Sequence, residues 1–338
     1  MLLQITSIGG RPSLSGYKVC AAANAWRGAI SGNNSLQLGV NEATRRGTVQ
    51  MVATTATPAW QPTLVKRVIR VLATSTRPIE VEMDDGIRAF VKVLGNPEGP
   101  SALACEFIGT ALAHALGIPA FEIAVSHFPD ELCMPLEHGL RPEPGPCYAT
   151  KAITGISWDG TPEALDVIEN PEHVVGLVVL DLLLRNPDRH FVRFGRTRRN
   201  LRNVFLAEDG VPRGSFRLTA IDHTHCIRQD GELTQRSLTI ENERDEQLYG
   251  LFPAFIEVIE REDLAPYVER LRQLAHSNEI DDIVNRTPRP WLPAGQVRQD
   301  LPGFLKRRAA HVAANVENWL AAACGWATTS STTTTSAP

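Results

Sequence analysis

Two alternating segments around an Asp-Asp-Gly turn constrain the fold of this chain more than any other stretch. Residues 79–83 read IEVEM and residues 87–94 read IRAFVKVL, so apolar and polar side chains alternate on both sides of the turn. Gly86 supplies the positive φ that a tight hairpin turn requires. The pattern therefore predicts an antiparallel β-hairpin.

Further elements flank this hairpin. A β-rich run at residues 64–72 precedes it, and residues 101–116 follow it with a helical periodicity that ends at Gly117. Residues 121–128 predict another strand. The order strand, hairpin, helix, strand indicates a small sheet that carries one helix.

The second half of the chain is predicted to be mostly helical. It begins after a Pro- and Gly-rich segment at residues 135–146, and Asn170 is the expected N-cap of its first helix. Its predicted elements are a helix at 171–185, a loop at 186–202, short strands at 203–206 and 216–221, and helices over 248–320 interrupted at 288–293. The fold class is therefore α+β, with a β-rich small lobe and a helical large lobe.

This pattern divides the chain into four parts. They are an N-terminal extension at 1–60, a small lobe at 61–130, a helical lobe at 131–326 and a Ser/Thr-rich tail at 327–338. The tail has nine Ser or Thr among its twelve residues and no charge, so we expect it to be disordered.

The N-terminal extension differs in composition from the body of the chain. It has five basic residues and a single acidic one, Glu42. Two interpretations stay open: an organelle transit peptide, or translation that begins at Met51. In either case we expect the first sixty residues to be dispensable.

Composition and charge exclude several classes of protein. The net charge of −4 over 338 residues argues against a bulk nucleic-acid binder. The longest apolar run, residues 174–184, contains Asp181 and falls short of the ~20 residues that cross a bilayer, so no membrane partner is expected. The six scattered cysteines have no CxxC pair, which excludes zinc ribbons and disulfide scaffolds. Gln4 interrupts the first apolar stretch, so a cytoplasmic location is the default expectation.

A lysine and a glutamate lie inside the predicted apolar elements of the small lobe. Lys92 lies between Val91 and Val93, so its side chain points to the face opposite theirs. Glu106 lies in the following helix among apolar neighbours. Either Lys92 is an exposed lysine on a half-solvated sheet, or it points into a cleft and pairs with Glu106. Phosphoryl transfer needs such a cation on the nucleotide phosphates and an anion that orients it.

Three polar residues stand at the ends of predicted elements in the large lobe. Asp188 follows a helix in the run RNPDRH, Asn203 precedes a short strand, and Asp222 ends the next strand. A kinase large lobe assembles its catalytic acid and its metal ligands in this order. Oxygens of Asn and Asp also suit the hard cation Mg²⁺.

Together these motifs resemble the HipA-like kinase family, in particular its forms without a fused antitoxin. The resemblance rests on K-x-x-GNPxGP-x-ALxxE, NPDRH and IDH in this order, and it covers about residues 64–320. It implies a two-lobed protein-kinase-like fold, ATP and Mg²⁺ as cofactors, and phosphorylation of a serine or threonine hydroxyl in a protein. It also implies a separate antitoxin-like regulator as a partner.

The resemblance gives each candidate residue a role. Lys92 would hold the ATP phosphates and Glu106 would orient Lys92. Asp188 would orient the acceptor hydroxyl. Asn203 and Asp222 would bind magnesium.

A hinge to the adenine is implied in the segment that begins at Cys147 and Tyr148. Ala149 and Lys151 are the cofactor-binding positions expected there, and the backbone would make the contacts. The identity of the side chains therefore carries little information.

The sequence departs from the kinase pattern in two places. The metal-binding Asn of a kinase catalytic loop usually follows the catalytic Asp by about five residues. Asn203 is fifteen residues from Asp188, residues 191–202 look like an insertion, and Asn200 is a competing ligand. No GxGxxG loop precedes Lys92, so we expect the Asp-Asp-Gly turn or the GNPEGP segment at 95–100 to cover the phosphates.

Seven arginines lie between residues 185 and 202. A basic loop beside a catalytic acid would recognise a phosphorylated or acidic substrate or RNA, or it is a solvated insertion. Phe191 and Phe194 are its only aromatic residues, so we do not expect nucleic acid as a partner.

Two classes of function stay open. One is a kinase acting on a protein, with a small-molecule or lipid-type phosphotransferase as its variant. The other is a catalytically weak pseudokinase that serves as a regulatory binding module. The intact set of lysine, glutamate and two aspartates favours the enzyme.

Overall fold

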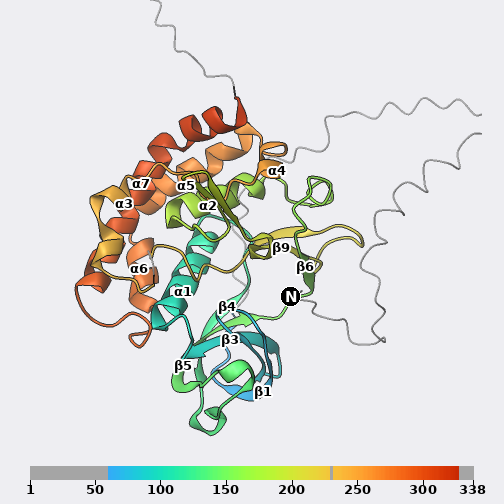
Figure 1. Cartoon of the computed structure of the whole chain (residues 1–338), viewed down its shortest axis with the longest axis vertical. Helices are drawn as coiled ribbons and strands as arrows, with labels where there is room; N and C mark the ends of the chain where they lie inside the picture. The colour runs from blue at the N-terminus through green and yellow to red at the C-terminus, as the bar shows by residue number, and fades with distance from the viewer. Residues whose placement is uncertain (1–59, 229–230, 327–338) are drawn as a thin grey trace, which may run out of the picture. The chain divides into compact units, whose positions relative to one another are not determined.

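The computed structural model describes residues 60–228 and 231–326 (Figure 1). The predictions for the tail and for the N-terminal extension concern residues outside this description, except Trp60, which packs in the core of the small lobe. The described chain combines a β-rich lobe with a helical lobe, as the α+β class predicts. Among the described residues, no helix has both the length and the apolar character needed to cross a membrane.

The small lobe is a five-stranded antiparallel sheet in the order β1-β2-β3-β5-β4. Its strands are β1 (Val65–Val71), β2 (Ile79–Met83), β3 (Arg88–Leu94), β4 (Ile123–Phe128) and β5 (Glu143–Lys151). β2 and β3 are the predicted hairpin, and Gly86 in its turn has a φ of 80°. The edge strands approach one another through a bridge between Leu64 and His127, so the sheet curls around its own core.

The alternation along β3 and β5 divides their side chains between two faces. Val91, Val93 and Ala149 lie in the core of the small lobe. Lys92 and the cross-strand Tyr148 lie on the other face. This second face is the one that can serve a site between the lobes.

The sheet extends further along the chain than the predicted lobe boundary at residue 130. β5 pairs with both β3 and β4, so residues 143–151 belong to the small lobe and not to the helical lobe. The Pro- and Gly-rich segment looked like a linker. In the structure it connects two neighbouring strands through the short 3₁₀ turns η2 (Asp130–Leu132) and η3 (Glu137–Gly139).

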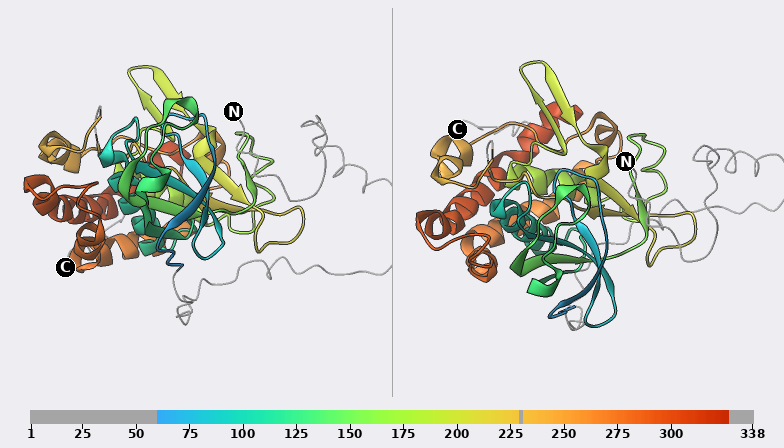
Figure 2. Two further views of the ribbon diagram at one scale, coloured as in Figure 1. Left: turned by 90° about the horizontal axis from the view of Figure 1, so that it is seen from below. Right: turned by 60° about the horizontal axis from the view of Figure 1, so that its bottom comes forward.

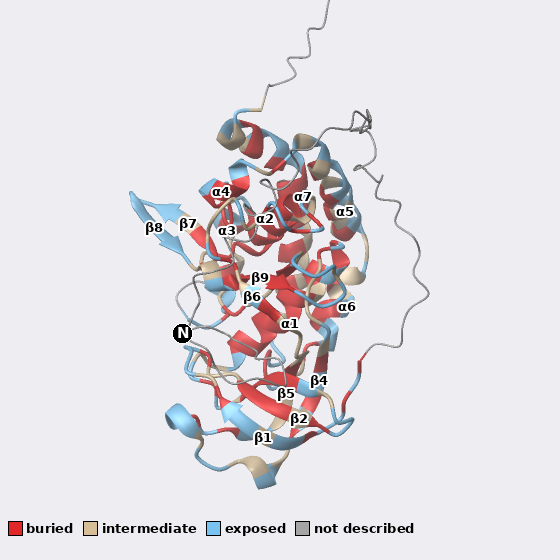
Figure 3. Ribbon diagram, turned by 90° about the vertical axis from the view of Figure 1, so that its right-hand side faces the viewer, coloured by how far each residue is buried: buried red, intermediate tan, exposed pale blue. Residues whose placement is uncertain are grey.

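Seven α-helices lie within the described residues. They are α1 (Pro100–Ala115), α2 (His173–Leu184), α3 (Ile240–Glu243), α4 (Pro253–Ile256), α5 (Ala265–His276), α6 (Glu279–Arg286) and α7 (Gln296–Cys324), with the 3₁₀ turns η4 (Leu201–Asn203), η5 (Gln235–Leu238) and η6 (Arg261–Leu264). Nearly every residue of α2 is apolar and buried, so this helix forms the centre of the helical lobe (Figure 3).

The expected cap of α2 has a different role. The helix begins at His173, and the Asn170 side chain binds Leu218 instead. Its Nδ2 donates to the Leu218 carbonyl at 3.1 Å, and its Oδ1 accepts from the Leu218 N–H at 2.8 Å. Asn170 therefore ties the approach to α2 to a strand.

Two small sheets complete the helical lobe. β6 (Gly155–Ser157), β9 (Val204–Ala207) and β10 (Arg217–Ala220) form one in the order β10-β9-β6, and β7 (His190–Arg193) pairs with β8 (Arg196–Arg199) in the other. The prediction of an unstructured loop over 186–202 is therefore wrong. Phe194 and Gly195 both have positive φ and close a two-residue hairpin turn. The apolar alternation that reveals a strand is weak here, because most of the hairpin is exposed.

Candidate active site

A cavity of about 450 Å³ lies between the face of β3 and β5 that carries Lys92 and Tyr148 and the ends of β9 and β10. This volume is within the range of small-molecule sites. The five residues predicted for catalysis and metal binding all line it: Lys92, Glu106, Asp188, Asn203 and Asp222. The fold thus brings together residues that are up to 130 positions apart in the sequence.

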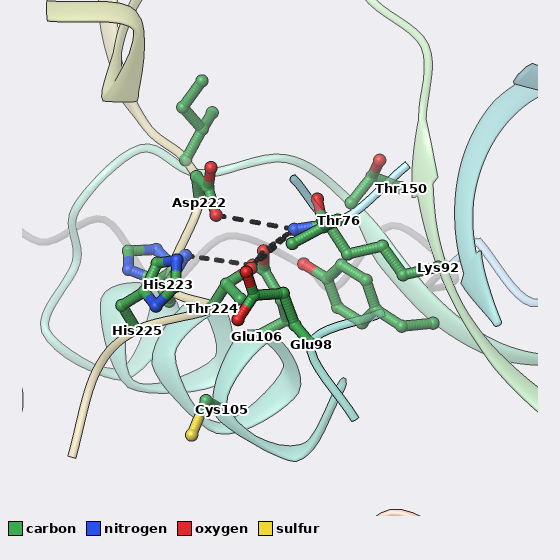
Figure 4. Close-up of polar contacts among 12 residues, drawn as sticks. Thr76, Lys92, Glu98, Cys105, Glu106, Thr150, Asp222, His223, Thr224 and His225 are labelled. Carbon is green, nitrogen blue, oxygen red and sulfur yellow. Dashed lines mark hydrogen bonds and ion pairs between the residues drawn. The ribbon is translucent and has the colours of Figure 1, made fainter. Parts of the chain in front are cut away.

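Lys92 is at the centre of a buried polar cluster (Figure 4). Its Nζ donates to Glu106 and, at 2.8 Å, to Thr224 Oγ1. A carboxylate oxygen of Asp222 lies 3.5 Å from the same nitrogen. The lysine is therefore paired, and the interpretation of an exposed lysine on a half-solvated sheet is wrong.

Glu106 accepts hydrogen bonds from two other residues of the site besides Lys92. The Thr224 hydroxyl donates to its Oε1 at 2.6 Å, and the backbone N–H of His223 donates to its Oε2 at 3.0 Å. Three donors from two segments thus fix a carboxylate that projects from α1. A fixed carboxylate is what orienting a lysine requires.

Charge in this cluster keeps Lys92 and Asp222 ionised, whereas burial raises the pKa of Glu106. Burial alone would lower the pKa of Lys92, but the carboxylates of Asp222 and Glu106 outweigh it and raise that pKa above its usual value. Burial would likewise raise the pKa of Asp222, but the Lys92 ammonium outweighs it, and the pKa of Asp222 is lowered. The site therefore presents a permanent cation beside a permanent anion.

α1 packs very closely on the segment that follows Asp222. A Cβ added at Gly109 would lie 2.4 Å from the Cβ of His223. Burial, followed by the Arg189 guanidinium, lowers the pKa of His223 to about 3, so the ring is neutral at physiological pH. Because Gly109 has no side chain, α1 can approach His223 this closely, and Glu106 on the same helix can reach its partners.

The loop RNPDRH is held by a buried aspartate on α2. Asn186 Nδ2 donates to Asp181 Oδ1 at 3.0 Å, and Arg189 Nε donates to Asp181 Oδ2 at 2.7 Å. Asn186 also accepts the backbone N–H of Asp188 at 3.1 Å. Asp188 is therefore positioned by neighbours on both sides whose side chains are fully buried.

Three side chains donate to the Asp188 carboxylate. Arg198 contacts Oδ1, Asn203 Nδ2 lies 2.9 Å from Oδ2, and Asn200 Nδ2 lies 3.3 Å from Oδ2. The residues inserted between Asp188 and Asn203 form the β7–β8 hairpin, which explains the unusual spacing. Both candidate asparagines reach the acid, and Asn203 makes the shorter contact.

The donor set at this end of the cavity fits a hard cation. The Asn203 amide nitrogen is bound to Asp188, and its Oδ1 accepts no hydrogen bond from any residue in the described ranges. The Asp222 side chain is 35% exposed at the cavity. An amide oxygen and a carboxylate are ligands that Mg²⁺ accepts together with phosphate oxygens.

The loop that covers the cavity is not the one expected from the sequence. Residues 72–76 and Pro78, between β1 and β2, line it and bring three consecutive hydroxyl side chains, Thr74, Ser75 and Thr76. The Asp-Asp-Gly turn contacts Thr63 and Trp60 instead. Asn96 of the GNPEGP segment supports the loop from behind by donating to the Thr76 carbonyl at 2.6 Å. The sequence feature that could have identified this loop is its run of small hydroxyl residues between two predicted strands.

On β5 the side chains at the cavity are those of Tyr148 and Thr150. Ala149 lies in the core of the small lobe, and Lys151 pairs with Glu122. The Lys151 backbone N–H is bound to the Glu122 carbonyl at 3.0 Å. The structure therefore does not bring the side chains of Ala149 and Lys151 to the cavity. Tyr148 lies opposite Lys92 in the sheet. This register, had it been recognised from the sequence, would have indicated that Tyr148 and Thr150 face the cavity.

This combination of elements defines a class of protein. A curled antiparallel sheet carries a lysine that pairs with a glutamate on helix α1. An acid, an amide and a second acid from the helical lobe line the same cavity, which is the arrangement of the protein-kinase-like phosphotransferases. The crystal structure of the Helicobacter pylori proinflammatory kinase CtkA is similar, with a TM-score of 0.52 and 13% identity over 78% of this chain and 99% of that chain. The golgi casein kinase structure, with a TM-score of 0.41 and 10% identity over 77% of this chain and 72% of that chain, is too remote to carry an argument.

The family follows from the sequence itself. A family model described as HipA-like kinase matches residues 65–300, which is well over half of the chain. The chain belongs to the HipA-like kinase family and is a phosphotransferase. A comparison with curated protein sequences finds no match.

Proposed function

We propose that this kinase transfers the γ-phosphoryl group of ATP, in the presence of Mg²⁺, to a serine or threonine hydroxyl of a protein. The observation that carries the proposal is the Lys92–Glu106–Asp222 cluster, which lines the same cavity as Asp188 and Asn203. Each group that phosphoryl transfer requires has one candidate there.

The cavity lining combines apolar and polar side chains. Phe90, Phe121 and Phe205 are among the lining residues, and apolar side chains of this kind suit a purine base. Lys92 and the hydroxyl-bearing loop also line the cavity and would contact the phosphates. The backbone of the segment that begins at Cys147 and Tyr148, within β5, remains the proposed contact to the adenine.

The residues of the chain would divide the work of the transfer. Lys92, oriented by Glu106, would bind the phosphates and stabilise the charge that develops on them. Asp222 and Asn203 would hold the metal through their oxygens. When bound there, the metal would supply positive charge that stabilises the phosphates. Asp188 would accept the hydrogen bond of the acceptor hydroxyl and orient it.

The experiment is transfer from ATP and Mg²⁺ to a mixture of serine- and threonine-containing peptides, read by intact mass of the peptides and of the protein. The wild type should add phosphoryl groups to hydroxyls, and Asp188→Asn should lower the rate by about 100-fold or more. A wild type that binds MgATP but transfers nothing would support a pseudokinase. Transfer to lipids or small molecules alone would support the other variant. A cytoplasmic location and a separate antitoxin-like regulator stay predictions from the sequence.

A further inference from the structure

The β7–β8 hairpin is a fixed projection beside Asp188 (Figures 2 and 3). At its base, Phe191 stacks on Tyr249 with 5.0 Å between ring centroids and 8° between ring planes. The N–H of Gly250 donates to the His190 carbonyl at 2.8 Å. The hairpin therefore presents its outer residues in one defined orientation.

The register of the hairpin collects three arginines on one face. Arg193 lies opposite Arg196, and Phe191 lies opposite Arg198. Residues opposite one another and residues two positions apart share a face. Arg193, Arg196 and Arg198 thus form what we call the arginine face, whereas Arg199 lies on the reverse face.

The arginine face begins at the catalytic acid and carries unbalanced charge. Arg198 contacts the Asp188 carboxylate. Arg193 and Arg196 are exposed, and neither has a carboxylate partner within the described residues. The sequence from Arg189 to Ala207 contains no acidic residue. Exposed guanidinium groups without carboxylate partners attract carboxylate and phosphate groups, which they bind in a planar fork.

We propose that the arginine face selects acceptor proteins that carry an anionic side chain, carboxylate or phosphate, close to the phosphorylated hydroxyl. The inference rests on the proposed transfer to a serine or threonine residue. The anion would also draw Arg198 away from Asp188, and this would free the oxygen that the acceptor hydroxyl needs. Binding of the anionic side chain would thus be coupled to exposure of the Asp188 carboxylate.

The spacing of the arginines suits an extended peptide. Arg196 and Arg198 are two residues apart on one strand, a distance of about 7 Å. Side chains on one face of an extended peptide repeat at the same distance, so anions about two and four residues from the acceptor should be preferred.

Nucleic acid is the less favoured occupant of this surface. Single-stranded nucleic acid is bound through aromatic side chains on which its bases stack. On this hairpin Phe191 is already stacked on Tyr249, and Phe194 alone is open to solvent, with 91% of its surface exposed. A second alternative is that the charges only protect an exposed strand edge from pairing.

The test compares kcat/KM for three serine peptides of one length, with neutral, aspartate or phosphoserine residues at the flanking positions. The wild type should prefer an anionic peptide over the neutral one by about tenfold. Arg196→Gln should reduce that preference to about twofold, whereas Arg199→Gln, with the same change of charge on the reverse face, should keep it. The ratio between the aspartate and phosphoserine peptides shows which anion is the natural one.

Arg198→Gln gives a result of the opposite sign. Without the guanidinium on Asp188, transfer to the neutral peptide should increase by about threefold while the preference for anions falls. A purely structural role of Arg198 would lower all three rates together.

Several outcomes would overturn the inference. Equal rates on the three peptides would do so while leaving the proposed function intact. An equal loss of the preference for anionic peptides in Arg196→Gln and Arg199→Gln would also do so, because it would indicate an effect of net charge alone. Absence of peptide preference together with tight binding of single-stranded RNA would assign the face to nucleic acid. Absence of transfer to any hydroxyl would refute the proposed function and the inference with it.

Discussion

Arg189 and Asp181 form an ion pair in which neither side chain is exposed, with Nε 2.7 Å from Oδ2. Arg189 adjoins Asp188, and its Nη2 donates at 3.1 Å to the carbonyl of Ile221, the residue before Asp222. The pair therefore links the loop that carries Asp188, the segment that carries Asp222 and the buried helix α2. The geometry of the site therefore depends in part on this buried contact.

We expect Asp181→Ala to reduce the free energy of unfolding by about 3–5 kcal/mol, because it leaves a buried guanidinium without its carboxylate. The matched control is Glu279→Ala, which breaks the partly exposed pair with Arg270 and should cost less than about 1 kcal/mol. Urea denaturation of both variants measures the difference. Equal losses would show that burial of the Arg189 pair has no energetic consequence.

The same substitution in two helices should have opposite effects. In α1, Gly109→Ala would place a Cβ against His223 and separate Glu106 from its partners, so stability and phosphoryl transfer should both fall. In α7, the Cβ of Gly303→Ala would meet only the end of the flexible Arg307 side chain. That change should raise stability by about 0.5 kcal/mol. Thermal midpoints that move in the same direction would argue against the close packing of α1.

The asparagines near Asp188 can be separated by their effect on magnesium. Asn203→Ala removes a candidate oxygen ligand, so transfer should fall and the Mg²⁺ concentration for half-maximal rate should rise about tenfold. Asn200→Ala removes only the longer 3.3 Å contact to Asp188 and should shift this concentration little. A Mg²⁺ titration on each variant decides. A larger shift in Asn200→Ala would reverse the assignment.

Much of this architecture could be predicted from the sequence where local patterns were strong. The Gly86 hairpin, the helix that carries Glu106 and the strand ends at Asn203 and Asp222 follow from alternation, helical periodicity and turn residues. The assignment of β5 to the small lobe depends on its pairing with β3 and β4, and no local sequence pattern reveals this pairing.

The remaining differences have similar causes. Asn170 looked like a helix cap, but its side chain makes two hydrogen bonds to a residue 48 positions away. Thr224 joins the Lys92 cluster through the turn after Asp222, where nothing in its neighbours indicates a partner on α1. Long-range contacts of this kind decide which polar residues become part of a site.

The central claim is that Lys92 acts in phosphoryl transfer, and one variant tests it directly. In Lys92→Met the buried stem is retained and Glu106 keeps the hydrogen bonds of Thr224 and His223, so the protein should fold. Lys66→Met, on the exposed face of β1, is the matched control. The decisive measurement is the rate of γ-phosphoryl transfer, with the thermal midpoint recorded on the same samples. We predict a loss of about 100-fold or more in Lys92→Met, in protein that still folds but melts at a lower temperature because the buried Glu106 loses its cation, and wild-type rates in the control. A rate within about tenfold of the wild type in folded Lys92→Met would contradict the account, because electrostatic stabilisation by this lysine should be worth more than that.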